Sequence, residues 1–150
     1  NKKKNSSAKL WPTFIKNESE KFEARFLSVR VKKNNSLFFD GMVDSSIPVV
    51  VSHGEGRVSF SDDNNLIEML KNEQITLKFD DKNGTLSYPD NPNGSPFGIT
   101  SMSNTSGRFT IMMPHPERNF RSDQNSWHPK NWGEFGPWYR MFTNTNKYFN

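Results

Sequence analysis

The chain has 150 residues, enough for one domain, but only 32% of them are hydrophobic and the mean hydropathy is −0.85, so it is either a marginal domain or part of a larger one. It has no cysteine, and we expect no metal site. It has no apolar run of the roughly 18 residues that span a membrane and no secretory signal, so we expect no membrane partner and a cytoplasmic location. The net charge of +4 is uneven, with ten Lys/Arg against three Glu in residues 1–35, and we interpret this segment as a solvated surface rather than a nucleic-acid site.

In the first half of the chain, the residue patterns predict one loop, two strands and one helix. Residues 1–9 are polar and without periodicity, which predicts a flexible basic loop. Alternation over residues 20–33 predicts a strand, and the apolar run Ile47–Val51 predicts a strand covered on both faces. Cap-type residues followed by Leu66, Met69 and Leu70 at helical spacing predict a short helix in residues 61–72.

The second half is dominated by turn signals. Residues 74–89 predict a hairpin with its tight turn at Asn83-Gly84, and residues 98–114 predict a second hairpin turning near Ser106-Gly107. Residues 137–147 predict a helix that begins with proline and places Trp138, Met141 and Phe142 on one face. The sum is a mixed α/β arrangement with more strand than helix.

The stretch MMPHPER places His115 and Glu117 two residues apart, just after a predicted strand. Residues i and i+2 of extended backbone point the same way, and Pro114 and Pro116 restrict the backbone on either side of His115. A general base needs such a fixed imidazole, with a carboxylate on its other nitrogen to select the tautomer. The same pair also occurs as a purely structural hydrogen bond, so the triplet alone leaves both interpretations open.

Five motifs in chain order closely resemble the glutaminase domain of phosphoribosylformylglycinamidine synthase in its long, single-chain form. They are WPTFIKNESEKFEARF (11–26), HGEGR (53–57), NPNGS (91–95), MPHPER (113–118) and SWHPKNWGEFGPW (126–138). The resemblance implies that residues 10–150 are the C-terminal portion of a class I glutamine amidotransferase domain. The implied fold is α/β and flavodoxin-like, with a mixed sheet, hairpins and few helices.

The family hydrolyses glutamine with a Cys-His-Glu triad, and the resemblance assigns the histidine to His115 and the glutamate to Glu117. The cysteine and its elbow have no counterpart here, so we expect them upstream and expect the fragment to be inactive alone. The ammonia would convert formylglycinamide ribonucleotide to formylglycinamidine ribonucleotide in purine biosynthesis. The implied partners are glutamine and the synthetase domain of the same polypeptide, where ATP and Mg would bind; no cofactor is expected in this segment.

Four further residues are candidates for the glutamine pocket or a domain contact. His53 and Glu55 belong to the HGEG loop, while Asn93 and Ser95 belong to NPNGS, which is also typical turn chemistry. A supporting role in the loop is the alternative for His53. Two functions from other classes stay open at this point: a non-catalytic interaction domain and a nucleic-acid-binding module.

Overall fold

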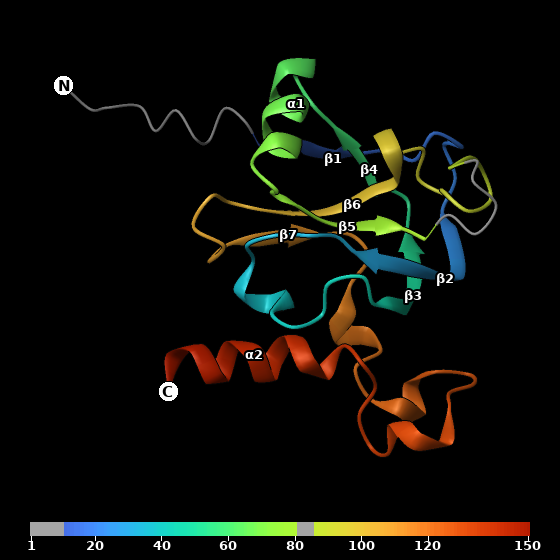
Figure 1. Ribbon diagram of the computed structural model, residues 1–150. Coiled ribbons are helices and arrows are strands. Elements are labelled where there is room, and N and C mark those ends of the chain that lie inside the picture. The colour runs from blue at the N-terminus through green and yellow to red at the C-terminus, as the bar shows by residue number, and fades with distance from the viewer. Residues whose placement is uncertain (1–10, 81–85) are drawn as a thin grey trace.

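The computed structural model describes residues 11–80 and 86–150, and its centre is a five-stranded antiparallel sheet (Figure 1). The strand order is β3-β2-β5-β6-β7. The strands are β2 (Glu23–Val31), β3 (Ser46–His53), β5 (Ile75–Phe79), β6 (Ile99–Ser103) and β7 (Thr110–Met112). The expected α/β class is confirmed, with every pairing between the described strands antiparallel. The expected loop at residues 1–9 lies outside the described part of the chain.

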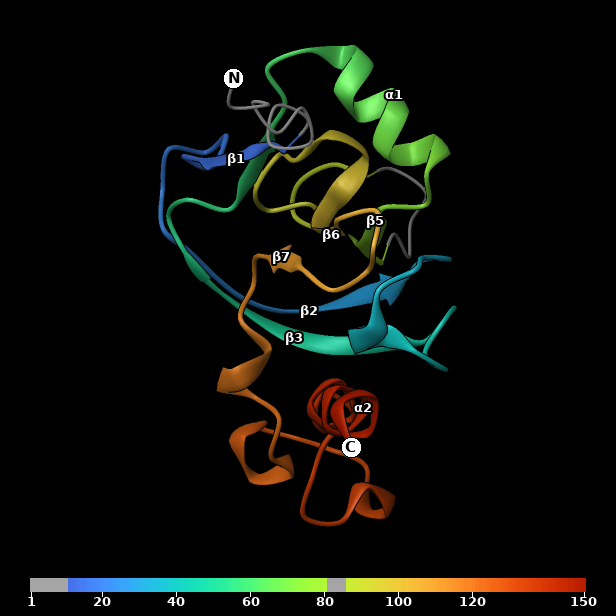
Figure 2. The same ribbon diagram turned by 90° about the vertical axis from the view of Figure 1, so that its left-hand side faces the viewer.

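Strands β2 and β3 form the longest pairing and curl beneath the rest of the sheet (Figure 2). Strand β2 corresponds to the alternating segment 20–33, and β3 corresponds to the predicted apolar run Ile47–Val51. In β3, Ile47, Val49 and Val51 are buried while the residues between them are half-buried. The prediction that this strand is covered on both faces is therefore wrong in degree, because only one face packs completely against the core.

A smaller layer lies above the sheet. Strands β1 (Thr13–Ile15) and β4 (Arg57–Ser59) pair with each other, and helix α1 (Asp63–Lys71) follows. Asp62 caps the helix by accepting a hydrogen bond from the backbone N–H of Asn64, as the cap-type residues predicted. A small core joins this layer to β5 and β6; its buried members are Val58, Leu66, Met69, Ile75, Ile99 and Met102.

The two predicted hairpins have different outcomes. Strands β6 and β7 form the second hairpin, and Gly107 adopts a positive φ of 71° in its turn. In the first, the turn at Asn83-Gly84 lies outside the described residues. Strand β5 pairs instead with β2 and β6, and residues 86–89 contain no strand. The alternating pattern thus identified β5 correctly but not its partners.

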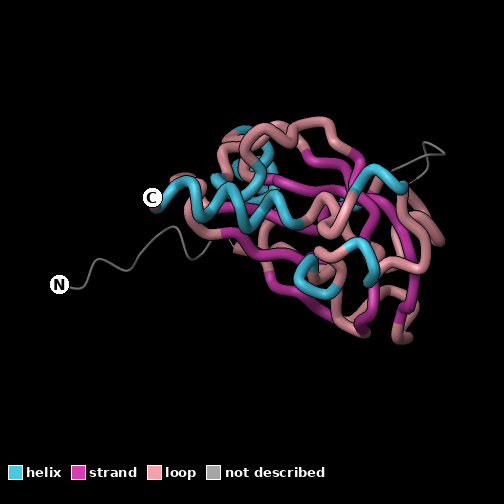
Figure 3. Tube along the Cα trace, turned by 90° about the horizontal axis from the view of Figure 1, so that it is seen from below, coloured by secondary structure: helices cyan, strands magenta, loops and turns pink. Residues whose placement is uncertain are grey.

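Helix α2 (Tyr139–Phe149) lies on the side of the sheet opposite α1 (Figures 1 and 2), and Figure 3 shows this side from below. It begins and ends two residues later than predicted. Trp138 and Met141 are buried with the 3₁₀ turn η2 (Leu37–Phe39) in the larger core, whereas Phe142 is 44% exposed. The predicted apolar face is therefore only partly covered. No helix among the described residues is long and apolar enough to cross a membrane.

Candidate functional site

His115 and Glu117 lie where the chain leaves β7. His115 has extended backbone and caps the 3₁₀ turn η4 (Pro116–Arg118). Its Nδ1 lies 3.3 Å from Oε1 of Glu117, and the two side chains are 35% and 57% exposed. The expected contact between His115 and Glu117 is present, although Glu117 lies in a 3₁₀ turn and not in the extended backbone from which the contact was predicted. Nε2 is the nitrogen left to exchange a proton with a reacting group.

Hydrogen bonds on both sides hold this turn against the sheet. The backbone N–H of Met113 donates to the carbonyl of Thr100 on β6 at 3.0 Å. The side-chain amide of Asn119 donates to the carbonyl of Pro48 on β3 at 3.3 Å. These two hydrogen bonds tie the segment that carries His115 to β6 and β3, which restricts the positions that its imidazole ring can adopt.

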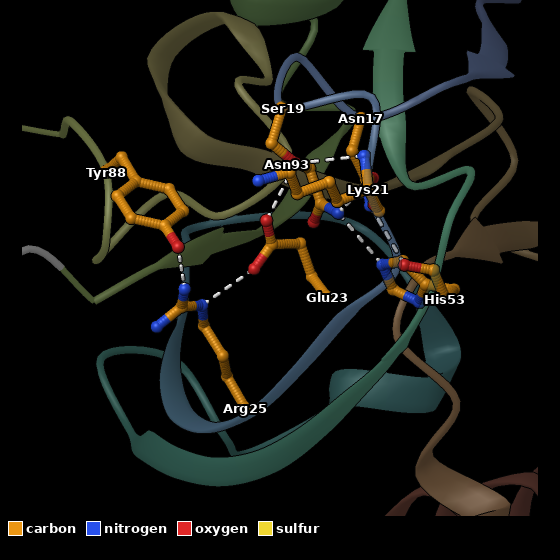
Figure 4. Close-up of polar contacts among 8 residues, drawn as sticks. All are labelled: Asn17, Ser19, Lys21, Glu23, Arg25, His53, Tyr88 and Asn93. Atoms are coloured by element: carbon orange, nitrogen blue, oxygen red, sulfur yellow. Dashed lines mark hydrogen bonds and ion pairs between the residues drawn. The ribbon is translucent and has the colours of Figure 1, made fainter.

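The HGEG and NPNGS loops meet in a buried hydrogen-bond network with a third loop (Figure 4). Asn93 donates from Nδ2 to Nε2 of His53 at 3.0 Å and to Oδ1 of Asn17 at 2.7 Å. Asn17 donates to the backbone carbonyls of His53 and Lys21, both at 2.9 Å, and its Oδ1 accepts from the N–H of Gly56. Asn17 lies within one of the five motifs, but its role was missed, since a single asparagine carries no local signal.

The other two candidates have different surroundings. Ser95 is buried; its Oγ accepts from the N–H of Val58 at 3.0 Å and its own N–H donates to Asn91, so it braces β4. Glu55 is exposed and takes no part in the bonds that join His53, Asn17 and Asn93. Of the four candidates, only His53 and Asn93 are brought into direct contact with each other.

The charge of His115 influences the pKa of His53. Burial lowers the pKa of His53 below its usual value, and the positive charges of His115 and Arg118 lower the pKa further. The end of β3 and the turn η4 therefore share one electrostatic environment. Nδ1 of His53 is buried and finds no hydrogen-bond partner among the described residues.

A charged cluster not predicted from the sequence adjoins this network. Glu23 lies opposite His53 in the β2–β3 ladder and is buried. It accepts hydrogen bonds from Oγ of Ser19 at 2.7 Å and Nε of Arg25 at 2.9 Å, and Arg25 also reaches the hydroxyl of Tyr88 (Figure 4). The cluster borders a cavity of about 670 Å³.

We expect Glu23 to make folding stability sensitive to acid. Burial raises its pKa, but hydrogen bonds from Ser19 and Arg25 and the charges of Arg25 and Lys21 outweigh burial, so the net pKa is lowered. The folded state then binds fewer protons than the unfolded state below about pH 4.3, and stability falls as the pH drops through that region. Melting temperatures between about pH 3 and 6 should fall less steeply for Glu23→Gln than for the wild type. Parallel curves for the two proteins would contradict the prediction.

The two glycines of the HGEG loop make a matched pair for testing the network. A Cβ on Gly56 would overlap the imidazole of His53 and the amide of Asn93, whereas a Cβ on Gly54 would meet nothing. We expect Gly56→Ala to lower the free energy of unfolding by about 1–3 kcal/mol through overpacking, and Gly54→Ala to change it by less than about 0.5 kcal/mol. Denaturant unfolding of both variants checks this, and equal losses would mean that the contact at Gly56 is loose.

The chain belongs to the family of CobB/CobQ-like glutamine amidotransferase domains, which matches residues 1–149. The domain class expected from the five motifs is thereby confirmed.

Among solved structures, the chain is similar in fold to PurLQS from Thermotoga maritima, with a TM-score of 0.63 and 23% sequence identity. The match covers 93% of this chain and 53% of the other, so the chain spans about half the length of that protein.

Proposed function

We propose that this chain supplies the histidine and the glutamate of a glutaminase site. The observation that carries the proposal is the His115–Glu117 pair, with Nδ1 facing the carboxylate at 3.3 Å on a turn tied to two strands. Because the 150 residues contain no cysteine, the nucleophile has to come from polypeptide outside them. Alone, the segment is expected to be inactive.

In this proposal the cysteine thiolate attacks the side-chain amide carbon of glutamine. His115 donates a proton to the leaving nitrogen, the C–N bond breaks, and ammonia departs from a thioester. His115 then takes a proton from water, whose oxygen attacks the thioester; glutamate is released, and the cysteine thiolate and the protonated His115 are restored. Glu117 orients the ring through Nδ1, so both proton transfers run through Nε2.

We further propose that the ammonia feeds the ATP-dependent conversion of formylglycinamide ribonucleotide to formylglycinamidine ribonucleotide, a ligase reaction. The support is the set of five motifs in chain order, together with the fold shared with PurLQS. ATP and Mg would bind in a synthetase domain of the same polypeptide. Among residues 11–80 and 86–150, no three His, Asp or Glu side chains gather at a spacing suited to a metal ion.

The test joins this chain to the polypeptide that carries the cysteine. The assembled protein should release ammonia from glutamine, and with ATP and Mg it should convert formylglycinamide ribonucleotide to the amidine. A folded assembly that releases no ammonia from glutamine would refute the glutaminase role. Ammonia release without amidine formation would refute only the purine substrate.

A further inference from the structure

Strand β7 lies at the end of the five-stranded sheet and, within the described part of the chain, pairs with β6 alone. The N–H of Met113 donates to the carbonyl of Thr100 at 3.0 Å, just past the β6–β7 ladder. Hydrogen bonds alternate along an antiparallel strand, so Ile111 also faces β6, while Thr110 and Met112 turn their backbone N–H and C=O the other way. No group from residues 11–80 or 86–150 is bonded to that outer side.

The opposite edge of the sheet, formed by β3, is closed. The carbonyl of Pro48 accepts hydrogen bonds from the side chains of Asn119 at 3.3 Å and Trp138 at 2.8 Å, and proline lacks the N–H that a further strand would need. Sheets protect their edges in such ways, because an open row of N–H and C=O groups invites another strand to pair. The three residues of β7 include neither a proline nor a charge, so this edge is the one available for pairing.

The side chains of β7 are also only partly covered. Ile111 packs at the margin of the smaller core and Met112 at the margin of the larger one, and both are half-buried. Phe109, just before the strand, is 69% exposed. A strand added at this edge would extend both cores at once. The low hydrophobic content of 32% agrees with cores that are completed by polypeptide outside the 150 residues.

The open edge ends three residues before His115. Pro114 and Pro116 have no N–H, so a ladder on this side cannot continue far beyond Met112. A strand alongside β7 would lie about 4.8 Å from it, so the end of that strand nearest Met112 comes within side-chain reach of His115. The thiolate that His115 serves has to lie in contact with its Nε2, and the 150 residues contain no cysteine to supply it.

We propose that the outer side of β7, at Thr110 and Met112, is the docking edge for the polypeptide segment that carries the cysteine. The segment adds a strand beside β7 and thereby completes the active site. The inference rests on the proposed glutaminase function and names the partner of that site. Backbone pairing suits this role, because it fixes the register of an added strand and so the position of its end relative to His115.

The first measurement is amide hydrogen exchange in the assembled protein. Pairing at the docking edge should slow the exchange of the Thr110 and Met112 amides to within about tenfold of that of Ile111, whose N–H bonds to β6. Exchange of these two amides more than about tenfold faster than that of Ile111 would overturn the proposal. The measurement needs no catalytic activity, so protected amides in a protein that releases no ammonia would refute the glutaminase role and not the docking edge.

The second measurement identifies the occupant by comparing two proline substitutions in the β6–β7 hairpin. Met112→Pro removes an outward N–H without removing a bond to β6, so the peptide that carries the cysteine should exchange at least about tenfold faster than in the wild type. Glutamine hydrolysis should fall by a similar factor or more. Unchanged exchange of the cysteine-bearing peptide would mean that this segment does not lie on β7, and would overturn the proposal.

Thr105→Pro is the matched control for that substitution. Thr105 is exposed and is the second residue of the turn that the N–H of Gly107 closes on the carbonyl of Asn104 at 3.0 Å, a position that favours proline. It should change neither the exchange of the cysteine-bearing peptide nor glutamine hydrolysis. If Met112→Pro fails to fold, the exchange of Thr110 and Met112 in the wild type decides the proposal.

Discussion

Replacing His115 with alanine should lower glutamine-dependent synthesis by at least about 10³-fold while leaving synthesis from free ammonia nearly unchanged. In the proposed mechanism, the substitution removes the group that protonates the leaving nitrogen and activates water, and it changes nothing that is needed once ammonia is present. His115 is 35% exposed and belongs to neither of the two hydrophobic cores, so its loss should not unfold the domain. The measurement is amidine formation by the assembled protein with glutamine or with an ammonium salt.

Two further variants sharpen that experiment. His128→Ala removes a histidine that stacks on Trp132 and should leave both reactions intact. Glu117→Gln should lower the glutamine-dependent rate only about fivefold. The reason is that an ion pair with a carboxylate that is 57% exposed contributes roughly 1 kcal/mol at most. If His115→Ala kept its glutamine-dependent rate, the assignment of the base would fail. If the variant lost both reactions equally, the effect would be structural.

Trp138→Ala should produce the largest loss of stability of any single truncation proposed for this chain, about 3–5 kcal/mol. The side chain is 0% exposed, lies in the larger core at the start of α2, and donates from Nε1 to the carbonyl of Pro48 at 2.8 Å. The truncation would leave a cavity between α2 and β3 and would remove one of the two side-chain donors to the carbonyl of Pro48, the other being Asn119. Denaturant unfolding should show a lower midpoint.

Trp127→Ala is the matched control, since Trp127 is 71% exposed in the same C-terminal region. We expect its change in unfolding free energy to stay within about 0.5 kcal/mol. Trp138→Phe should fall between the two, because it keeps most of the ring but loses the hydrogen bond. A small effect for Trp138→Ala would mean that α2 docks through other contacts.

Patterns that act over a few residues predicted the individual elements well. Alternation located β2, an apolar run located β3, and a capped helical spacing located α1. The pattern failed where distant pairing decides the outcome: β5 was assigned to a hairpin but lies between β2 and β6. Phe142 was expected on the same face as Trp138 and Met141 but is 44% exposed, because the buried side of α2 runs through Met141 and Asn144. Alternation specifies which residues share a face and not which strand lies alongside.

By itself, the sequence determined the glutamine amidotransferase class and the local His115–Glu117 pair, because motif order and an i, i+2 spacing need no knowledge of the folded chain. Only the tertiary structure joined Asn17, His53 and Asn93, which are 36 to 76 residues apart, into one buried network. The physical reason is that the direction of these hydrogen bonds and the burial of the groups are set only when the separate loops come into contact. No spacing along the chain encodes which amide will face which imidazole.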